Sequence, residues 1–493
     1  MIIEMMEGIQ ELISWNVLIF LNIGIFLGII IGAIPGLGVM LAIAVLLPVT
    51  FSLDPVPGIV MLLGLYCAGT YGGSISAILL NAPGTPAAAA TLLDGYPLFQ
   101  RGEAKKALMM SLIASVTAGL ISAVILIGAA PQLAKVTMMF GAPEYFSLAV
   151  FGLSIIASVA GKDILKGLIG GCLGLFIATI GLDPATAVPR FTFGQSQLVG
   201  GIALIPALIG LFAFSEVLNK VNKPHVEKNN KDLTVGESTL NRNEWKKSSK
   251  TIVKSSLIGT IIGIIPGTGG TSGAFISHNE ARRSSKHPDR YGKGEIDGIA
   301  AAEAGNNGVT GATLIPLLTL GIPGDGATAV LLGAFMMNGL TPGPALFEDH
   351  GSIIYAVMFG LLIVNVFMFL QARVLINQFA RVSKLDDSFL APILILTCTA
   401  GVFAESSSIF HVNIALGFGL LAYFLIKFGF SPVPVLLGIV LGPILESNLL
   451  RAMTISEGDP SIFITRPISL FFLILTFAAI IVISRANKKT KNA

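Results

Sequence analysis

Pro-Gly dipeptides interrupt four apolar stretches of the sequence, and each interruption could bind an anion. The dipeptides are Pro35-Gly36, Pro83-Gly84, Pro266-Gly267 and Pro323-Gly324. Proline removes a backbone donor and clashes with the preceding helical turn, whereas glycine permits positive φ, so we expect a helix to break at each dipeptide. A helix that restarts after such a break presents unpaired N–H groups and the positive end of its dipole, which suit a carboxylate.

Glycine, hydroxyl and amide residues beside these dipeptides are the candidate substrate-binding residues. Because the breaks recur at matching places in both halves of the chain, we favour a binding role over four unrelated kinks. The predicted set is Gly36, Gly38, Asn81, Gly84, Thr85, Gly267, Thr268, Gly269, Asn306, Asn307 and Gly324. The Gly-x-x-x-Gly spacings Gly28/Gly32 and Gly259/Gly263 are, by themselves, more typical of a helix-packing seam.

Two acidic residues near the fourth break are candidates for ion coupling. Asp325 could hold Na⁺ or relay a proton, or it could cap the helix that follows Gly324, which is a common use of aspartate. Glu303 could couple to the same ion, or it could lie near the cytoplasmic interface. Carboxylates are costly in lipid, so we expect both to face protein or water. Lysine and arginine are nearly absent from the apolar stretches, so co-transported Na⁺ or H⁺ would help to neutralise an anionic substrate.

Residue patterns for catalysis, metals or nucleic acid are missing from the sequence. It has no HExxH and no nucleophile elbow, and Cys67, Cys172 and Cys398 are isolated among apolar residues. The formal net charge is +3, and no basic stripe with interleaved aromatic residues is present. We therefore expect no catalytic residue, no metal site, no cofactor and no nucleic-acid partner, and we expect that the protein is not an enzyme.

The elements that must position these residues are membrane helices. Of the 493 residues 53% are hydrophobic and 12% are charged, and apolar runs such as "LFFLILTFAAIIVIS" need lipid around them. The sequence therefore predicts an all-α polytopic membrane protein with about 11–13 membrane segments, including broken or re-entrant helices. The first residues are acidic and lack a basic n-region, so no cleaved signal peptide is expected.

The sequence also contains an internal repeat. "GIIIGAIPGLG" from Gly28 returns as "GTIIGIIPGTG" from Gly259, and three further pairs of phrases follow in the same order. This duplication predicts a first membrane repeat at 1–218, a basic cytoplasmic linker at 219–254, a second repeat at 255–467, and an extra C-terminal helix with a cytoplasmic tail at 468–493.

The charges of matching loops indicate that the two repeats have inverted topology. Residues 48–58 contain no lysine or arginine, but the matching residues 278–297 contain five. Residues 96–106 contain three, but the matching residues 339–350 contain none. Cytoplasmic loops are rich in lysine and arginine, so the bias places the N-terminus outside and the C-terminus in the cytoplasm. Inverted repeats are typical of secondary transporters in the cell membrane.

Several long phrases of the sequence resemble a known family, the large membrane subunit of the tripartite tricarboxylate transporters (TctA). The phrases are "IPGLG", "APGTPAAAATLLDGYPLFQRGEAKKAL", "IPGTGG", "RRSSKHPDRYGKGEIDGIAAAEAGNNG", "LTLGIPGDGATAVLLGAF" and "GLTPGPALF". The phrase Asp94-Gly95-Tyr96-Pro97 and the phrase from Lys286 to Gly294 are the most specific. The resemblance extends over nearly the whole chain.

The resemblance implies a secondary transporter that takes up carboxylates with an extracytoplasmic substrate-binding protein and a small membrane subunit of about four helices. Carried onto this sequence, the transport loops would be the four Pro-Gly breaks with Asn306 and Asn307. The chain departs from the family at Asp325, where a small or neutral polar residue such as serine is usual, and at Thr85, where an acidic residue is often found. These departures put citrate in doubt as the substrate but not the family.

Other functions stay open at this point. A stand-alone cation-coupled organic anion symporter or exporter would need no binding protein. A membrane-embedded enzyme would need an acid–base pair or a metal constellation, and a scaffold would have no use for broken helices. Binding-protein-dependent uptake of a small organic anion is the leading interpretation.

Overall fold

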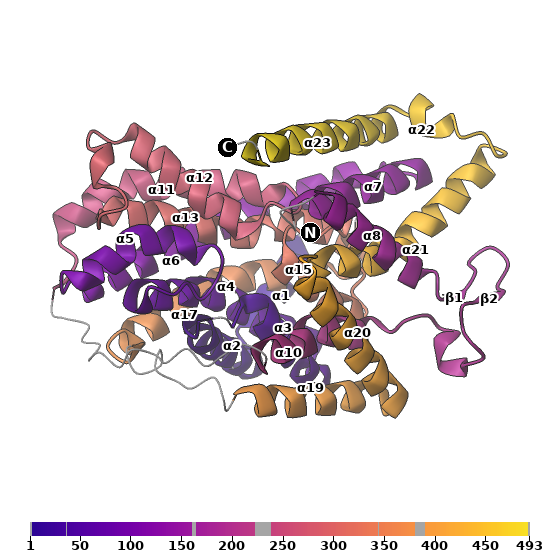
Figure 1. The fold of residues 1–493 in the computed structure, drawn as a ribbon, viewed down its shortest axis with the longest axis horizontal. Helices are drawn as coiled ribbons and strands as arrows, with labels where there is room; N and C mark the ends of the chain where they lie inside the picture. Colours follow the sequence, from indigo (N-terminus) through magenta and orange to yellow (C-terminus); the bar gives the residue numbers. More distant parts are fainter. Residues whose placement is uncertain are drawn as a thin grey trace. The chain divides into compact units, whose positions relative to one another are not determined.

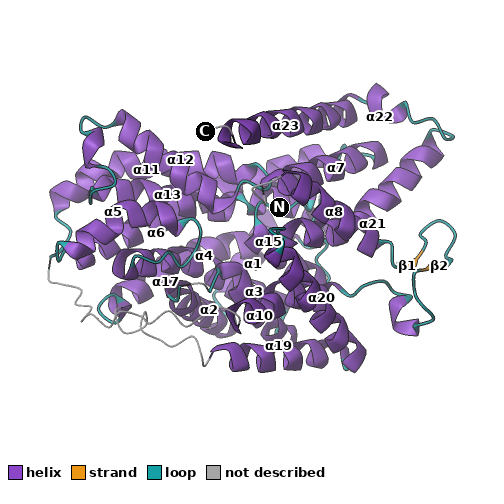
Figure 2. Ribbon diagram, viewed as in Figure 1, coloured by secondary structure: helices purple, strands orange, loops and turns teal. Residues whose placement is uncertain are grey.

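The computed structural model describes residues 2–35, 37–159, 164–221, 238–343, 345–379 and 390–491. These residues are mostly helical, and the strands among them are the short antiparallel pair β1 (Gly181–Leu182) and β2 (Pro189–Arg190) (Figure 2). The described part of the chain thus agrees with the predicted all-α class.

In the described part of the chain, six helices are long and apolar enough to cross a membrane. They are α2 (Trp15–Ala33), α4 (Pro55–Leu80), α6 (Ala104–Thr137), α17 (Gly351–Leu375), α20 (Ile409–Lys427) and α21 (Pro432–Ile455). Six further apolar helical segments have 10–17 residues. These helices indicate a multi-pass membrane protein, while the higher number of segments expected from sequence stays a prediction.

The chain packs into two compact units, and each unit takes residues from both halves of the sequence. Unit 1 comprises Met1–Ala134 and Pro224–Leu390, and unit 2 comprises Lys135–Lys223 and Ala391–Ala493. The predicted boundaries followed the repeat along the sequence instead, and they stay a prediction. Part of the predicted linker 219–254 lies outside the described residues, and its end from Arg242 is already helical.

Unit 1 contains all four Pro-Gly dipeptides. Besides α2, α4, α17 and most of α6, its helices are α1 (Ile2–Leu12), α3 (Val39–Leu46), α5 (Ala88–Gln100), α11 (Arg242–Ile264), α12 (Gly269–Ser284), α13 (Ile296–Ala312), α14 (Leu314–Leu320), α15 (Gly326–Met337) and α16 (Leu346–Asp349). The 3₁₀ turns Leu47–Ser52 and Pro288–Arg290 complete it. In Figure 1, α11, α12 and α13 lie side by side, next to α5 and α6.

Two helices form the centre of unit 1 because they are buried on every side. Nearly all residues of α4 are buried, and so is all of α13 except its second residue. A helix that is mostly apolar all round is stable only inside a larger protein or a membrane. α2 packs on α4, and α11 packs on α13.

Glycines let these two helix pairs approach closely. A Cβ at Gly28 would lie 2.8 Å from the carbonyl oxygen of Leu65, and one at Gly259 would overlap the carbonyl oxygen of Gly305. The Gly-x-x-x-Gly spacings therefore act as the helix-packing seams that their pattern indicates.

Local signals start and end the helices around the Pro-Gly dipeptides. α4 ends at Asn81 (φ 56°) and α14 ends at Gly321 (φ 71°), so both end in a left-handed residue two positions before the proline. α11 begins with a capping box in which Asn241 and Glu244 satisfy each other's backbone N–H groups.

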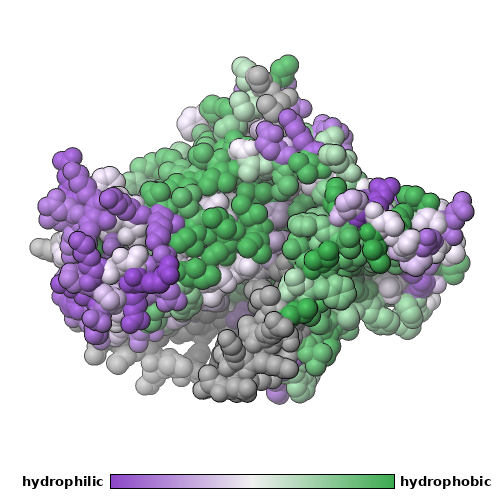
Figure 3. Space-filling view, turned by 90° about the horizontal axis from the view of Figure 1, so that it is seen from above, coloured by the Kyte–Doolittle hydropathy of each residue, from purple (hydrophilic) through white to green (hydrophobic). Residues whose placement is uncertain are grey.

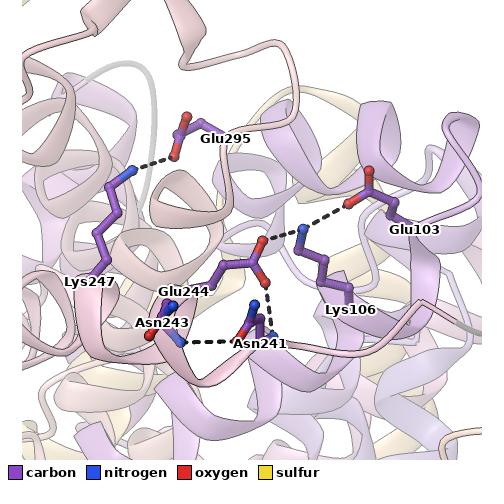
Figure 4. A network of polar contacts seen from close by, with 7 residues as sticks. All are labelled: Glu103, Lys106, Asn241, Asn243, Glu244, Lys247 and Glu295. Atoms are coloured by element: carbon purple, nitrogen blue, oxygen red, sulfur yellow. Dashed lines mark hydrogen bonds and ion pairs between the residues drawn. The ribbon is translucent and has the colours of Figure 1, made fainter.

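Charged residues join three helices of unit 1 near their ends (Figure 4). The Lys106 ammonium at the start of α6 lies 2.5 Å from Glu244 of α11 and 3.0 Å from Glu103. Lys247 of α11 lies 3.5 Å from Glu295, directly before α13. In Figure 3 hydrophilic residues gather over the part of unit 1 where Figure 1 places α5 and α11, beside an apolar surface.

Unit 2 contains α20, α21, the hairpin β1–β2 and further helices. These are α7 (Ala142–Val159), α8 (Ile164–Ala178), α9 (Leu204–Leu208), α10 (Ser215–Val221), α19 (Leu390–Ser406), α22 (Ile462–Thr465) and α23 (Pro467–Lys491), with a 3₁₀ turn at Ser196–Leu198 and a π-helix at Ile209–Phe214. α8 packs on α21, where a Cβ at Gly438 would lie 2.5 Å from the carbonyl oxygen of Gly171. Arg190 binds Glu446 through two hydrogen bonds, 2.7 and 3.1 Å long.

Candidate functional site

A helix ends before each of the four Pro-Gly dipeptides, and another helix begins after it. The four junctions are α2/α3, α4/α5, α11/α12 and α14/α15. Gly84 packs on the carbonyl oxygen of Gly32 near the first junction, and its N–H donates to the carbonyl of Gly73. The N–H of Gly267 donates to the carbonyl of Gly324 over 2.7 Å, so the third and fourth junctions are bonded to each other.

The α11/α12 junction leaves the start of α12 without a side-chain cap. The Thr268 hydroxyl is turned back to α11, where it donates to the carbonyls of Ile262 (2.5 Å) and Ile265 (2.9 Å). Gly269 begins the helix with φ +62°, a conformation that a residue with a side chain rarely adopts. Free N–H groups at a helix start are a general anion site.

Asn306 lies against this uncapped helix start. A Cβ at Gly270 would overlap the Asn306 side-chain oxygen, so only glycine leaves room for the amide there. The Asn306 side chain is 2% exposed, and its Nδ2 has no hydrogen-bond partner among the described residues. A buried donor without an acceptor costs about 1–3 kcal/mol. This donor is therefore available to an incoming acceptor such as a carboxylate.

The α14/α15 junction is capped by its own carboxylate. Asp325 Oδ1 accepts the Thr328 N–H over 2.8 Å, and the Thr328 hydroxyl lies 2.9 Å from the Asp325 backbone nitrogen, which completes a capping box. Tyr66 of α4 donates to Asp325 Oδ2 over 3.0 Å. Of the two uses considered for Asp325, the structure contains the cap. The Asp325 carboxylate occupies the start of α15, so a substrate carboxylate would have to displace it to bind there.

Asn307 and Glu303 point into a different cluster from Asn306. Glu303 is completely buried, and its partners come from two other helices. Thr91 of α5 donates to Oε1, and Ser115 of α6 donates to Oε2 over 2.9 Å. Asn307 Nδ2 donates to Ser115 Oγ over 2.9 Å and to the Glu303 backbone carbonyl over 3.1 Å. The amide of Asn307 is thus already engaged, and Glu303 does not lie at an exposed interface.

The remaining predicted residues have mainly local contacts. Asn81 is exposed at the end of α4, and the Thr85 hydroxyl accepts the Ala88 N–H over 3.4 Å. Gly38 precedes α3 with open space around it, and no side chain caps that helix start. Gly36 lies outside the described residues. The structure thus brings Gly267, Thr268, Gly269, Asn306, Gly324 and Asp325 together.

The two most distinctive phrases of the sequence meet in a clamp. Asp94 of α5 is fully buried, and its Oδ1 accepts the N–H groups of Gly292 (2.8 Å), Gly294 (3.0 Å) and Glu295 (2.9 Å). Its Oδ2 lies 2.9 Å from Nε2 of His278 on α12. Arg101 donates to the carbonyl of Lys293. Burial, followed by the nearby Asp297 charge, raises the pKa of Tyr291 to about 12, so its hydroxyl stays neutral beside His278.

Tyr66, Thr91, Ser115 and His278 were not anticipated from the sequence. Hydroxyl residues spaced three or four apart in the apolar helix α6, such as Ser111 and Ser115, were a usable signal because that spacing places them on one face. Among the described residues no group of three or more histidine, cysteine or acidic side chains could hold a metal ion.

Comparison with known proteins gives a family match over most of the chain. The model of the tripartite tricarboxylate transporter TctA family matches residues 18–437. The "Uncharacterized 52.8 kDa protein in TAR-I ttuC' 3'region" of Agrobacterium vitis is 36% identical over 465 residues, which are 93% of this chain and 91% of that protein.

A second relative from the same organism is shorter. The "Uncharacterized protein in TAR-II ttuC' 3'region" is 34% identical over 223 residues, 45% of this chain and 92% of that protein. No solved structure matches the chain. The family match spans all four Pro-Gly junctions and the Asp94 clamp, and the protein therefore belongs to the tripartite tricarboxylate transporter TctA family.

Proposed function

We propose that the protein is the large transmembrane subunit of an ion-gradient-driven carboxylate uptake transporter that depends on a binding protein. The substrate carboxylate would bind at the start of α12, between its free N–H groups and the amide of Asn306. The observation that carries this assignment is the Asn306 Nδ2, which is buried without an acceptor beside an uncapped helix start. Both features favour an anion, and neither has a structural use of its own.

Only part of the negative charge of a di- or tricarboxylate can be neutralised by these groups. Asp325 adds a further negative charge close by, because its Cβ would be 3.4 Å from a Cβ at Gly269. A co-transported cation, Na⁺ or H⁺, would offset this charge. Membership of a transporter family agrees with a role in transport rather than catalysis.

The mechanism proposed is alternating access with two inverted repeats. Support comes from the matched packing of the two halves. Gly28 packs on Leu65 in the first half, and Gly259 packs on Gly305 in the second half. Pro83-Gly84 follows Leu65 after the same number of residues as Pro323-Gly324 follows Gly305. Each repeat would supply its own helix start facing the substrate, as in other transporters built from inverted repeats.

The orientation proposed is an outside N-terminus and a cytoplasmic C-terminus in the cell membrane. The clamp and the Lys106 contacts hold the basic residues 96–106, the basic residues 278–297 and the start of α11 together at one end of unit 1. A common side for these segments is what the positive-inside rule requires. A binding protein would approach from the other side, and a small membrane subunit would complete the transporter.

Uptake in proteoliposomes tests this function. The vesicles would contain the chain with the small membrane subunit of about four helices, and would receive radiolabelled citrate, succinate or malate under imposed Na⁺ and proton gradients. We expect uptake only when the binding protein is added. Gradient-driven uptake without that protein would instead establish the stand-alone symporter. No uptake of any of these carboxylates by correctly inserted protein would overturn the carboxylate assignment.

A further inference from the structure

We propose that Glu303 is the group that carries the coupling ion, that this ion is a proton, and that it binds at Oε1. This inference rests on the proposed function, because it names the ion of the same transport cycle. It also selects between the two acidic residues near the fourth junction. Asp325 is committed to its capping box and to Tyr66, whereas Glu303 caps no helix and is bonded to neutral side chains of α5 and α6.

The surroundings of Glu303 contain no opposite charge. Its described partners are Thr91, Ser111, Ser115 and Asn307, which are neutral, and the residue is 0% exposed. Burial without a cationic partner disfavours the ionised carboxylate, whereas hydrogen bonds donated to it favour that form. Where the two effects offset each other, the neutral acid and the anion differ little in free energy. Such a group can both take up and release a proton.

Charged side chains on the neighbouring helices are bound to other partners. Facing α13 are Cys67 and Tyr71 on α4, Asp94 on α5 and His278 on α12. Cys67 is hydrogen-bonded to Thr310, and Asp94 and His278 bind each other. Lys254 on α11 binds Glu280, and Lys106 at the start of α6 binds Glu103 and Glu244. Tyr71 is a phenol whose hydroxyl has no partner among the described residues, and it stays neutral at physiological pH. Glu303 is therefore the group in this cluster that can change charge.

The hydrogen bonds fix which oxygen takes the proton. Asn307 donates to Ser115 Oγ, so the Ser115 hydroxyl must donate onward to Glu303 Oε2, which makes Oε2 an acceptor. Oε1 faces the Thr91 hydroxyl, which can rotate. When Glu303 is ionised, Thr91 donates to Oε1. When Oε1 carries the proton, it donates to Thr91 Oγ1. Both charge states are thus hydrogen-bonded without any movement of the backbone.

The same arrangement favours a proton over Na⁺. A sodium ion needs several oxygen ligands directed at one point, but Asn307 presents its amide nitrogen to this cluster, and the hydroxyls bond directly to the carboxylate. A proton needs only the Oε1 position.

Glu303 is close enough to Asn306 to couple the proton to the substrate. The two residues are three positions apart on α13, which is about 5 Å along the axis because each residue advances about 1.5 Å. An ionised Glu303 would repel a carboxylate at Asn306 through a medium of low dielectric constant. Protonation removes that repulsion, so one proton from the outside water would enter with the substrate. Its release to the cytoplasmic water would restore the anion and expel the substrate.

Glu303→Gln tests this inference, with Glu144→Gln as the matched control. Glutamine keeps the shape and the neutral charge but cannot release a proton. Glu144 in unit 2 is also buried, at 3% exposed, and accepts the Gly141 N–H over 2.8 Å. In proteoliposomes with the complete transporter, we expect Glu303→Gln to lose accumulation driven by a proton gradient while it retains counterflow exchange of radiolabelled citrate, succinate or malate. The Glu144→Gln control should retain both.

Other outcomes separate this inference from the proposed function. Normal proton-driven accumulation by Glu303→Gln would overturn the inference and leave the function standing. Wild-type accumulation that needs Na⁺ and ignores the proton gradient would overturn it as well. A wild-type protein that transports none of these carboxylates would overturn the proposed function instead.

A second variant covers the case in which Glu303→Gln fails to fold. Thr91→Val removes the hydroxyl that supports the ionised Oε1, so Glu303 should hold its proton more tightly. The midpoint of the pH dependence of counterflow should then move to higher pH than in the wild type. An unchanged midpoint would contradict the assignment of the proton to Oε1.

Discussion

At the scale of single residues, Asn306 separates a binding role from a structural one. Replacing it with alanine removes a donor that has no partner in the described structure, so folding should change little. Substrate binding should weaken instead, because a hydrogen bond to a charged group contributes about 1.5–3 kcal/mol. We expect Asn306→Ala to raise the KM of uptake by about tenfold or more, since about 1.4 kcal/mol corresponds to a factor of ten.

Asn338→Ala is the control for that measurement. Its amide also lies at the end of a helix in unit 1, but it donates to the carbonyl of Ala334 over 2.7 Å. The KM of Asn338→Ala should stay near that of the wild type. An Asn306→Ala transporter with an unchanged KM would remove the α12 start from consideration as the substrate site.

The capping role of Asp325 predicts that replacement by serine is tolerated. Serine can replace aspartate as a helix cap, but alanine cannot, and losing a cap costs about 0.5–2 kcal/mol. We therefore expect Asp325→Ser to retain gradient-driven uptake and most of the thermal stability of the purified protein. Asp325→Ala should lower the unfolding temperature measurably. If Asp325 carried the coupling ion, both variants would lose accumulation equally, which is the result that would refute the capping role.

The residue scale also shows where sequence reasoning ends. The capping use of Asp325 follows from its position after Pro-Gly, because a cap involves neighbours three residues away. Its second partner, Tyr66, is 259 positions away in the chain, and nothing in the local sequence indicates that contact. The same holds for Asn306 and Asn307. Their types predict hydrogen bonding, but only the packing of α12 and α6 decides which amide is free.

At the scale of elements, the glycine seams predict a strong contrast between two similar substitutions. A Cβ at Gly259 would overlap the backbone of α13, while a Cβ at Gly128 in α6 would meet nothing within 4 Å. Alanine is also a better helix former than glycine by about 1 kcal/mol. Gly128→Ala should therefore preserve or raise the unfolding temperature, and Gly259→Ala should lower both that temperature and uptake. Equal behaviour of the two variants would show that α11 and α13 do not need this close approach.

The Asp94 clamp predicts how one loop responds to protease. Asp94→Ala would leave three backbone N–H groups of residues 292–295 without an acceptor, so the loop between α12 and α13 should open. We expect trypsin to cut after Arg290 or Lys293 much faster than in the wild type. Asp94→Asn keeps the accepting Oδ1 and should be intermediate.

Asp289→Ala is the control for the clamp, because this aspartate is exposed in the same loop. Its cleavage rate should equal that of the wild type. Rapid cleavage of both variants, or of neither, would mean that Asp94 does not hold the loop.

The helix ends beside the Pro-Gly dipeptides could be predicted from the sequence, because proline and glycine act on their own backbone, whereas broken membrane helices stay a prediction. Helices end at Ala33, Leu80, Ile264 and Leu320, each within a few residues of a dipeptide. The grouping of helices into units was harder to foresee. Repeats can be detected along the sequence, but packing joined the first part of each half in unit 1 and the second part of each half in unit 2. Such exchange depends on which apolar faces meet, and helices that are apolar all round give no periodic signal of that choice.

At the scale of the whole molecule, inverted topology places matching loops on opposite sides of the membrane. Residues 48–58 should face outward, and their counterpart 278–297 should face the cytoplasm. Single cysteines at Ser52 and Lys286, both exposed, can report this after Cys67, Cys172 and Cys398 are replaced. A membrane-impermeant maleimide added to intact cells should label Ser52→Cys and leave Lys286→Cys unlabelled until the membrane is opened.

A third cysteine provides an internal check on the topology measurement. Arg101 contacts Lys293, so the loop around Glu103 must lie on the same side as Lys286. Glu103→Cys should therefore follow Lys286→Cys in every condition. If Ser52→Cys also followed them, the two halves would have parallel topology, and their helix starts would approach a bound carboxylate from the same side. Opposite labelling would instead give each repeat its own approach to the substrate, which is the geometric basis on which two inverted halves can expose one site alternately.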